Sequence, residues 1–108
     1  MTPNEVVYQT VRGVGIPGTY AAYQEGSAPP LPWFVYIRDR GGEVYADDSN
    51  YAVLPRYRVE LYMASRDSAL VDAVGDAIGE RFGPYSTYET WILSEHVLMV
   101  SYEFTYTK

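Results

Sequence analysis

The feature that most constrains the fold of this chain is alternation of apolar and polar residues in two segments. Residues 57–63 and 97–106 place an apolar or aromatic side chain at every second position, which is typical of a strand with one buried face. Between them, Leu70, Val74, Ile78 and Phe82 recur at a spacing of four. This spacing is that of an amphipathic helix that packs its apolar stripe on a sheet. We therefore expect a sheet that is covered on one face.

The first helix has a clear start and stop. Residues 2–5 (TPNE) carry the pattern of a capping box with proline at the first helical position, and Gly13 follows the last apolar repeat. The sequence therefore predicts a helix over residues 3–12. Further strands are predicted where β-branched and aromatic residues are bounded by turns, over residues 19–23, 33–38 and 85–92, with a turn at 93–96.

The second helix is expected to begin after Ser65, which offers a cap, with Asp67 favourable in the first turn. Gly83 and Pro84 end it. The resulting order is α-β-β-β-α-β-β, without regular βαβ alternation. We therefore predict a single domain over residues 1–108 of the α+β class, with a mainly antiparallel sheet of four to five strands and two helices packed on one face.

Two loops separate the first strands. Residues 24–32 contain three prolines, which cannot donate ladder hydrogen bonds. Gly41 and Gly42 favour a hairpin turn over residues 39–42, after which 43–46 can pair back. Residues 47–50 (DDSN) then form a polar loop.

The charge and cysteine content exclude several classes of protein. The net charge is −6 and the arginines do not form a basic patch, which disfavours a dedicated nucleic-acid reader and an anionic membrane surface. The chain has no cysteine, so it has no disulfide, thiolate metal site or cysteine nucleophile. Its first residues lack a secretory pattern and no run reaches 18 apolar residues. We expect a cytoplasmic protein.

Tyrosine is unusually frequent, with 12 in 108 residues. Its ring is apolar and its tip is polar, so it suits half-buried strands and subunit interfaces. The sequence leaves open a sheet with one wet face and an interface-specific role.

Two motifs match binding sites only as bare patterns. Gly13, Gly15 and Gly18 have the spacing of a dinucleotide loop, but a helix precedes them and a strand is predicted to follow, the reverse of the required context. Residues 47–50 offer oxygen ligands without the alternate spacing, glycine and closing glutamate of a calcium loop. We predict no cofactor and no metal site.

No catalytic group is expected. Ser94 and His96 share a predicted hairpin turn, and nothing in the sequence supplies the orienting group and oxyanion hole that a hydrolase needs. The carboxylates that could act as acid and base are spread over predicted solvent-facing positions, at Glu80, Glu89, Glu95 and Glu103.

Gly75 and Gly79 lie one turn apart in the second predicted helix, where each costs about 1 kcal/mol relative to alanine. They leave a stripe of that helix without side chains. Either a tyrosine of the same sheet or a neighbouring subunit packs closely there.

Several segments taken in order resemble the tail-completion (tail-terminator) or head–tail joining proteins of siphophages and prophages. The residues that carry the resemblance lie between about 14 and 106, at 25–30 (EGSAPP), 32–36 (PWFVY), 47–51 (DDSNY), 57–62 (YRVELY), 89–95 (ETWILSE) and 100–104 (VSYEF). The second helix departs from the family, which is richer there in glutamate and lysine and lacks the glycine pair. The hairpin at 38–42 also differs.

The resemblance implies a non-enzymatic structural protein of virion assembly. Such a subunit forms a homo-oligomeric ring, expected to be a hexamer, at the head-proximal end of the tail tube, where its partners are the tail-tube protein and the head connector. It would assemble in the bacterial cytoplasm and remain in the virion tail. Segments 24–32 and 39–50 are candidate docking arms, and the candidate oligomer surface comprises Asp47, Asp48, Asn50, Tyr51, Gly75 and Gly79.

Two other functions remain open on the sequence alone. The chain can be a small cytoplasmic α+β module that binds a small ligand or a partner protein, which an aromatic-lined cavity with convergent polar groups would favour. A hydrolase that uses Ser94 and His96 is the third possibility.

Overall fold

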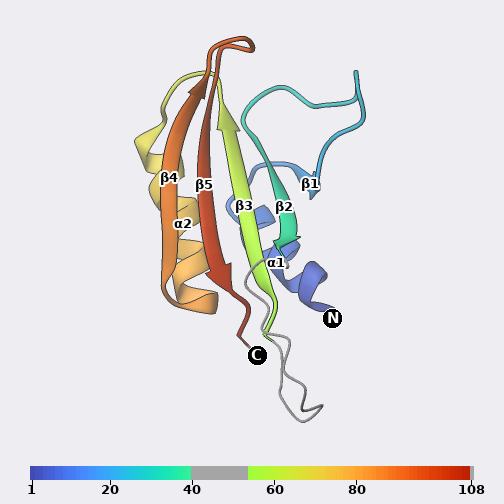
Figure 1. The fold of residues 1–108 in the computed structure, drawn as a ribbon, viewed down its shortest axis with the longest axis vertical. Helices are drawn as coiled ribbons and strands as arrows, with labels where there is room; N and C mark the ends of the chain where they lie inside the picture. The colour runs from blue at the N-terminus through green and yellow to red at the C-terminus, as the bar shows by residue number, and fades with distance from the viewer. Residues whose placement is uncertain (40–53, 108) are drawn as a thin grey trace.

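The computed structural model describes residues 1–39 and 54–107, which form two helices and a five-stranded sheet (Figure 1). This confirms the predicted α+β class and the predicted order of elements. In chain order the elements are α1 (Pro3–Arg12), β1 (Gly18–Tyr20), β2 (Trp33–Asp39), β3 (Arg56–Met63), α2 (Ser68–Phe82), β4 (Tyr85–Ile92) and β5 (Val97–Thr105).

The strands lie in the order β1-β2-β3-β5-β4. Each neighbouring pair is antiparallel except β1 and β2, which are parallel. Figure 1 shows both helices behind the sheet, with α1 behind β2 and β3 and α2 behind β4 and β5. The face toward the viewer carries neither helix. The predicted arrangement of two helices on one face is therefore present.

The core lies between the helices and the sheet. Apolar residues of both helices pack there on alternate residues of the strands; the fully buried ones are Val7, Val11, Phe34, Val59, Leu61, Val74, Ile78 and Val100. Two tyrosine hydroxyls join the layers. Tyr57 of β3 donates to Oδ1 of Asn4 in α1, and Tyr102 of β5 donates to the carbonyl oxygen of Val71 in α2 at 2.8 Å.

The caps of the two helices differ in how well the sequence predicts them. The capping box of α1 is present, because the Thr2 side chain accepts from the Glu5 amide and the Glu5 carboxylate accepts from the Thr2 amide. For α2 the predicted cap at Ser65 is wrong. Asp67 is the N-cap, and its carboxylate accepts from the Leu70 amide at 3.1 Å. A carboxylate at this position also interacts favourably with the helix dipole.

The first strand is shorter than predicted. Residues 19–23 were expected, whereas β1 spans Gly18–Tyr20. Ala21 has a φ of 64°, so the chain leaves the extended conformation directly after Tyr20. Gly18 is required where it is, because a Cβ there would overlap the Phe34 ring. The predicted terminal hairpin is confirmed, with its turn at residues 93–96 between β4 and β5.

Several predictions lie outside the described residues. They are the hairpin turn beyond Asp39, the returning segment 43–46 and the polar loop 47–50. Within the described ranges, no helix is long and apolar enough to cross a membrane.

Candidate interaction surface

One side of the sheet is not covered by either helix, and we call it the helix-free face. Successive side chains of a strand point to opposite faces, so this face is formed by the residues between those of the core. The described residues on it are Trp33, Val35, Ile37, Arg56, Arg58, Glu60, Tyr62, Ser86, Tyr88, Thr90, Ile92, Val97, Met99, Ser101, Glu103 and Thr105.

Several side chains of the helix-free face are less exposed to solvent than the sequence pattern suggests. Val35 is 3% exposed, Met99 7% and Ser101 0%, although no helix covers them. Ser101 lies in register with Glu60 on one side and Tyr88 on the other. Side chains of neighbouring strands therefore exclude water from the middle of the face. The Ser101 hydroxyl is buried without a hydrogen-bond partner within the described part of the chain.

A polar ladder runs along β3 on this face. Nε of Arg58 lies 3.0 Å from Oε2 of Glu60, and the Tyr62 hydroxyl donates to Oε1 of Glu60 at 2.9 Å. The three side chains are two residues apart, so they share the face. Burial raises the pKa of the Tyr62 phenol above its ordinary value, and the hydrogen bond to Glu60 raises it further. Glu60 thus holds both neighbours in fixed positions.

Strand β4 forms a long edge of the sheet. Its pairing with β5 is continuous from Tyr85 to Ile92, and seven of its eight residues are exposed. Tyr88 is 53% exposed and Trp91 52%. Natural edge strands usually carry lysine, proline or a bulge that prevents pairing with another chain. The sequence of β4 contains neither lysine nor proline, and Glu89 is its single charge.

A groove of about 500 Å³ lies beside this face, between the loop over residues 21–28 and the part of the face that contains Trp33, Val35 and Tyr62. Three aromatic rings contribute to its wall. The centroids of Tyr23 and Trp33 are 5.0 Å apart at nearly a right angle, and those of Trp33 and Tyr62 are 4.7 Å apart at 34°. Edge-to-face and tilted pairs of this kind are favourable. Glu25 and Glu95 also line the groove.

Only two of the residues predicted for the oligomer surface lie in the described part of the chain. Asp47, Asp48, Asn50 and Tyr51 lie outside it. Gly75 and Gly79 border a surface hollow with Asp76, Glu80 and Tyr85. A Cβ on Gly75 would overlap the Tyr85 hydroxyl, whereas one on Gly79 would lie 3.7 Å from Cε1 of Tyr85. Packing of a tyrosine of the same sheet therefore accounts for Gly75, which is one of the two explanations that the sequence left open.

The polar residues considered above as catalytic groups lie on separate parts of the structure. Ser94 and His96 lie in the exposed hairpin turn between β4 and β5. Glu80, Glu89 and Glu95 are exposed, as predicted, while Glu103 is half-buried on the helix-free face. Within residues 1–39 and 54–107, no group of three or more acidic or histidine side chains is placed to hold a metal ion.

Sequence reasoning did not find the groove or the polar ladder. The alternation over 57–63 contained the signal for the ladder, because Arg58, Glu60 and Tyr62 occupy successive positions of the same face. The groove brings Tyr23 from a loop to two strands, and no local pattern indicates that contact.

The chain matches no protein-family model, and no curated protein is significantly similar to it.

Proposed function

We propose that this protein is a non-enzymatic structural subunit that assembles with copies of itself. In its specific form, the proposal is a ring-forming tail-completion (tail-terminator) or head–tail joining component of a bacteriophage or prophage. The ring, expected to be a hexamer, would end growth of the tail tube and contact the head connector. It would assemble in the cytoplasm of the bacterial host and remain in the virion tail.

One observation of the structure carries the general proposal. The long edge strand β4 is exposed and carries the exposed aromatic residues Tyr88 and Trp91. It adjoins the helix-free face, where Met99 and Ser101 are buried from solvent. Unpaired strand edges accept a further strand readily, and aromatic side chains are enriched at subunit interfaces. A ring forms when β4 of one copy meets a different surface of the next copy and the rotation between copies closes, whereas β4 paired with β4 gives a two-fold dimer.

The phage assignment rests on the ordered resemblance of segments described above. The charge of the chain agrees with it, because a ring of subunits that each carry −6 would repel DNA and let a genome pass without binding it.

Mass measurement over a range of protein concentrations tests self-assembly. Light scattering after size exclusion is expected to show a concentration-dependent oligomer. Thr90→Lys, on the exposed edge of β4, is expected to shift the mass toward the monomer, since lysine protects strand edges. The matched control is Ala69→Lys on the exposed side of α2, which leaves β4 unchanged.

The outcomes separate the general proposal from the specific one. A strict monomer at high concentration would contradict self-assembly. An oligomer that fails to cap purified tail tubes would contradict the phage role alone.

A second candidate function is favoured by a different observation. The groove beside Tyr23, Trp33 and Tyr62 has aromatic walls and acidic groups, as expected of a small α+β module that binds a ligand or a partner protein. Its volume of about 500 Å³ is typical of binding sites.

A further inference from the structure

The groove presents aromatic surface from three separate segments. Tyr23 comes from the loop after β1, Trp33 begins β2 and Tyr62 lies near the end of β3. The ladder on β3 fixes the Tyr62 ring, because its hydroxyl is held by Glu60. Trp33 packs between Tyr23 and Tyr62, and all three rings are half-buried, so each retains surface toward the groove.

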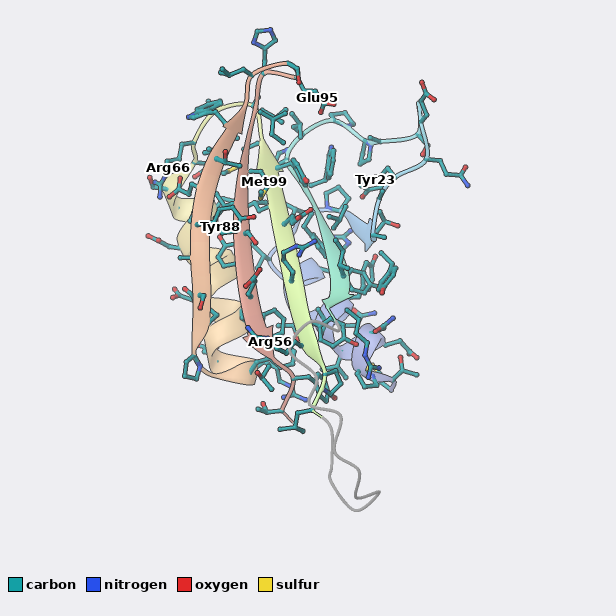
Figure 2. The ribbon with its side chains drawn as sticks, viewed as in Figure 1. Tyr23, Arg56, Arg66, Tyr88, Glu95 and Met99 are labelled. Carbon is teal, nitrogen blue, oxygen red and sulfur yellow. The ribbon has the colours of Figure 1, made fainter. Side chains whose placement is uncertain are left out.

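The charge of the groove has one sign. Glu25 and Glu95 are the charged residues among its lining, and no arginine, lysine or histidine of the described chain lines it. Figure 2 shows Tyr23 on the loop after β1 and Glu95 near the tip of the β4–β5 hairpin. Burial and the hydrogen bond to Glu60 do most to raise the pKa of Tyr62; the positive charge of Arg58 lowers it, and the negative charge of Glu95 raises it further.

We infer that this groove binds an arginine side chain carried by a segment of a partner protein. Aromatic faces attract cations, and the attraction is strongest where the cation is partly desolvated. Two carboxylates beside those rings add charge complementarity and can accept the guanidinium hydrogen bonds. The carboxylates disfavour an anionic ligand, and the comparison with an uncharged analogue below separates a cationic ligand from a neutral one.

Arginine fits this wall better than lysine does. The guanidinium is planar, is weakly hydrated and stacks on aromatic rings, while the ammonium of lysine is a compact, strongly hydrated charge. The groove is partly open to solvent and about 500 Å³ in volume, which is enough for an arginine side chain and adjoining backbone. The inference deepens the second candidate function, on which it rests, and is independent of self-assembly.

Fluorescence of Trp33 provides a direct measurement of binding. The chain has two tryptophans, and Trp91 lies on β4 outside the groove lining, so the Trp91→Phe protein reports from Trp33 alone. The probes are a blocked Gly-Arg-Gly-Arg-Gly peptide, its lysine analogue and its citrulline analogue, which keeps the shape of arginine without the charge. We expect saturable binding of the arginine peptide, weaker binding of the lysine peptide, and about tenfold or greater loss with citrulline.

Variants at exposed positions locate the site without disturbing the fold. The pair Glu25→Gln and Glu95→Gln is expected to weaken binding of the arginine peptide about fivefold at low salt. Glu80→Gln on α2 removes one exposed carboxylate elsewhere and serves as the matched control. Thermal melts by circular dichroism confirm that each variant is folded.

Four outcomes would overturn the inference. They are no saturable response to the arginine peptide, equal binding of the citrulline analogue, equal loss with Glu80→Gln, and equal binding of a blocked glutamate peptide. The mass measurement identifies a further alternative. If Glu25→Gln and Glu95→Gln lower the oligomer mass, the occupant is a second copy of this chain and not a separate partner.

Discussion

The two faces of the sheet are built from alternate residues of the same strands, yet they exclude water in different ways. On the covered face, Val59 and Val100 are buried by the helices that pack on them. On the helix-free face, Val35 and Met99 are buried to a similar degree by side chains of neighbouring strands. Lateral packing of this kind stabilises a sheet without a covering helix.

The strongest test of this difference compares adjacent residues of β5. Phe104 faces the helices and stacks on Phe82 with centroids 4.7 Å apart, whereas Thr105 faces the other way and is half-buried. We expect Phe104→Ala to lower the free energy of unfolding by about 3–5 kcal/mol, because it leaves a cavity. Thr105→Ala should change it by about 0.5 kcal/mol or less. Urea unfolding of both variants measures this, and similar losses would contradict the distinction between the faces.

Alkaline pH probes one tyrosine on each face. Burial raises the pKa of Tyr102 on the covered face and of Tyr62 on the helix-free face. A group whose pKa is higher in the folded state stabilises the fold fully below its unfolded pKa, and this contribution is lost as the pH rises toward the folded pKa. We therefore expect the free energy of unfolding to fall above about pH 10, the ordinary pKa of tyrosine.

The two tyrosines should contribute unequally to that fall. Tyr102 accounts for at most about 1.4 kcal/mol per pH unit. Tyr62 contributes less, because solvent on the helix-free side screens its interactions. Urea unfolding at stepped pH should give a shallower fall in Tyr102→Phe than in Tyr62→Phe, each measured relative to its own stability at neutral pH. A steeper fall in Tyr102→Phe than in Tyr62→Phe would mean that Tyr62 contributes more to the pH dependence than Tyr102 does, contrary to this expectation.

Substitutions at the two glycines of α2 test how tightly Tyr85 of β4 packs against that helix. Gly79→Ala should stabilise the protein by up to about 1 kcal/mol, because its Cβ meets Tyr85 at ordinary distance and alanine favours the helix. Gly75→Ala gains the same propensity but forces the Tyr85 ring outward, so it should be about 1–2 kcal/mol less stable than Gly79→Ala. The gap should close in a Tyr85→Ala background. Equal effects in the native background would leave Gly75 without a packing role.

Local signals in the sequence predict most of this fold. The alternation over 57–63, the stripe from Leu70 to Phe82 and the capping box at Thr2 each act within a few residues, and each is present in the structure. The parallel pairing of β1 with β2 was not predicted, because strand neighbours depend on long-range packing more than on propensity.

The candidate sites were harder to predict for the same reason. Gly75 was singled out by its cost in a helix, but its partner Tyr85 became evident only from the placement of β4. The aromatic groove requires Tyr23, Trp33 and Tyr62 to meet across long sequence separations. No spacing rule links residues of a loop to residues of two strands.

The smallest expected effect concerns the ion pair that joins β4 to the start of α2. Nε of Arg66 lies 2.8 Å from Oε1 of Glu89, and both side chains are about 40% exposed. The hydrogen bond from Arg66 lowers the pKa of the Glu89 carboxyl, so its contribution to stability is present at neutral pH and is lost as the pH falls through that pKa. Exposed pairs contribute little, and Glu89→Gln is expected to leave the thermal midpoint nearly unchanged. Glu80→Gln, which removes a carboxylate from the exposed side of α2, is the control.

If Glu89→Gln instead loosens β4, seen as faster amide hydrogen exchange along that strand, then the edge depends on the ion pair more than on its pairing with β5. In that case β4 would be available for pairing with a second copy only while Arg66 holds it in place.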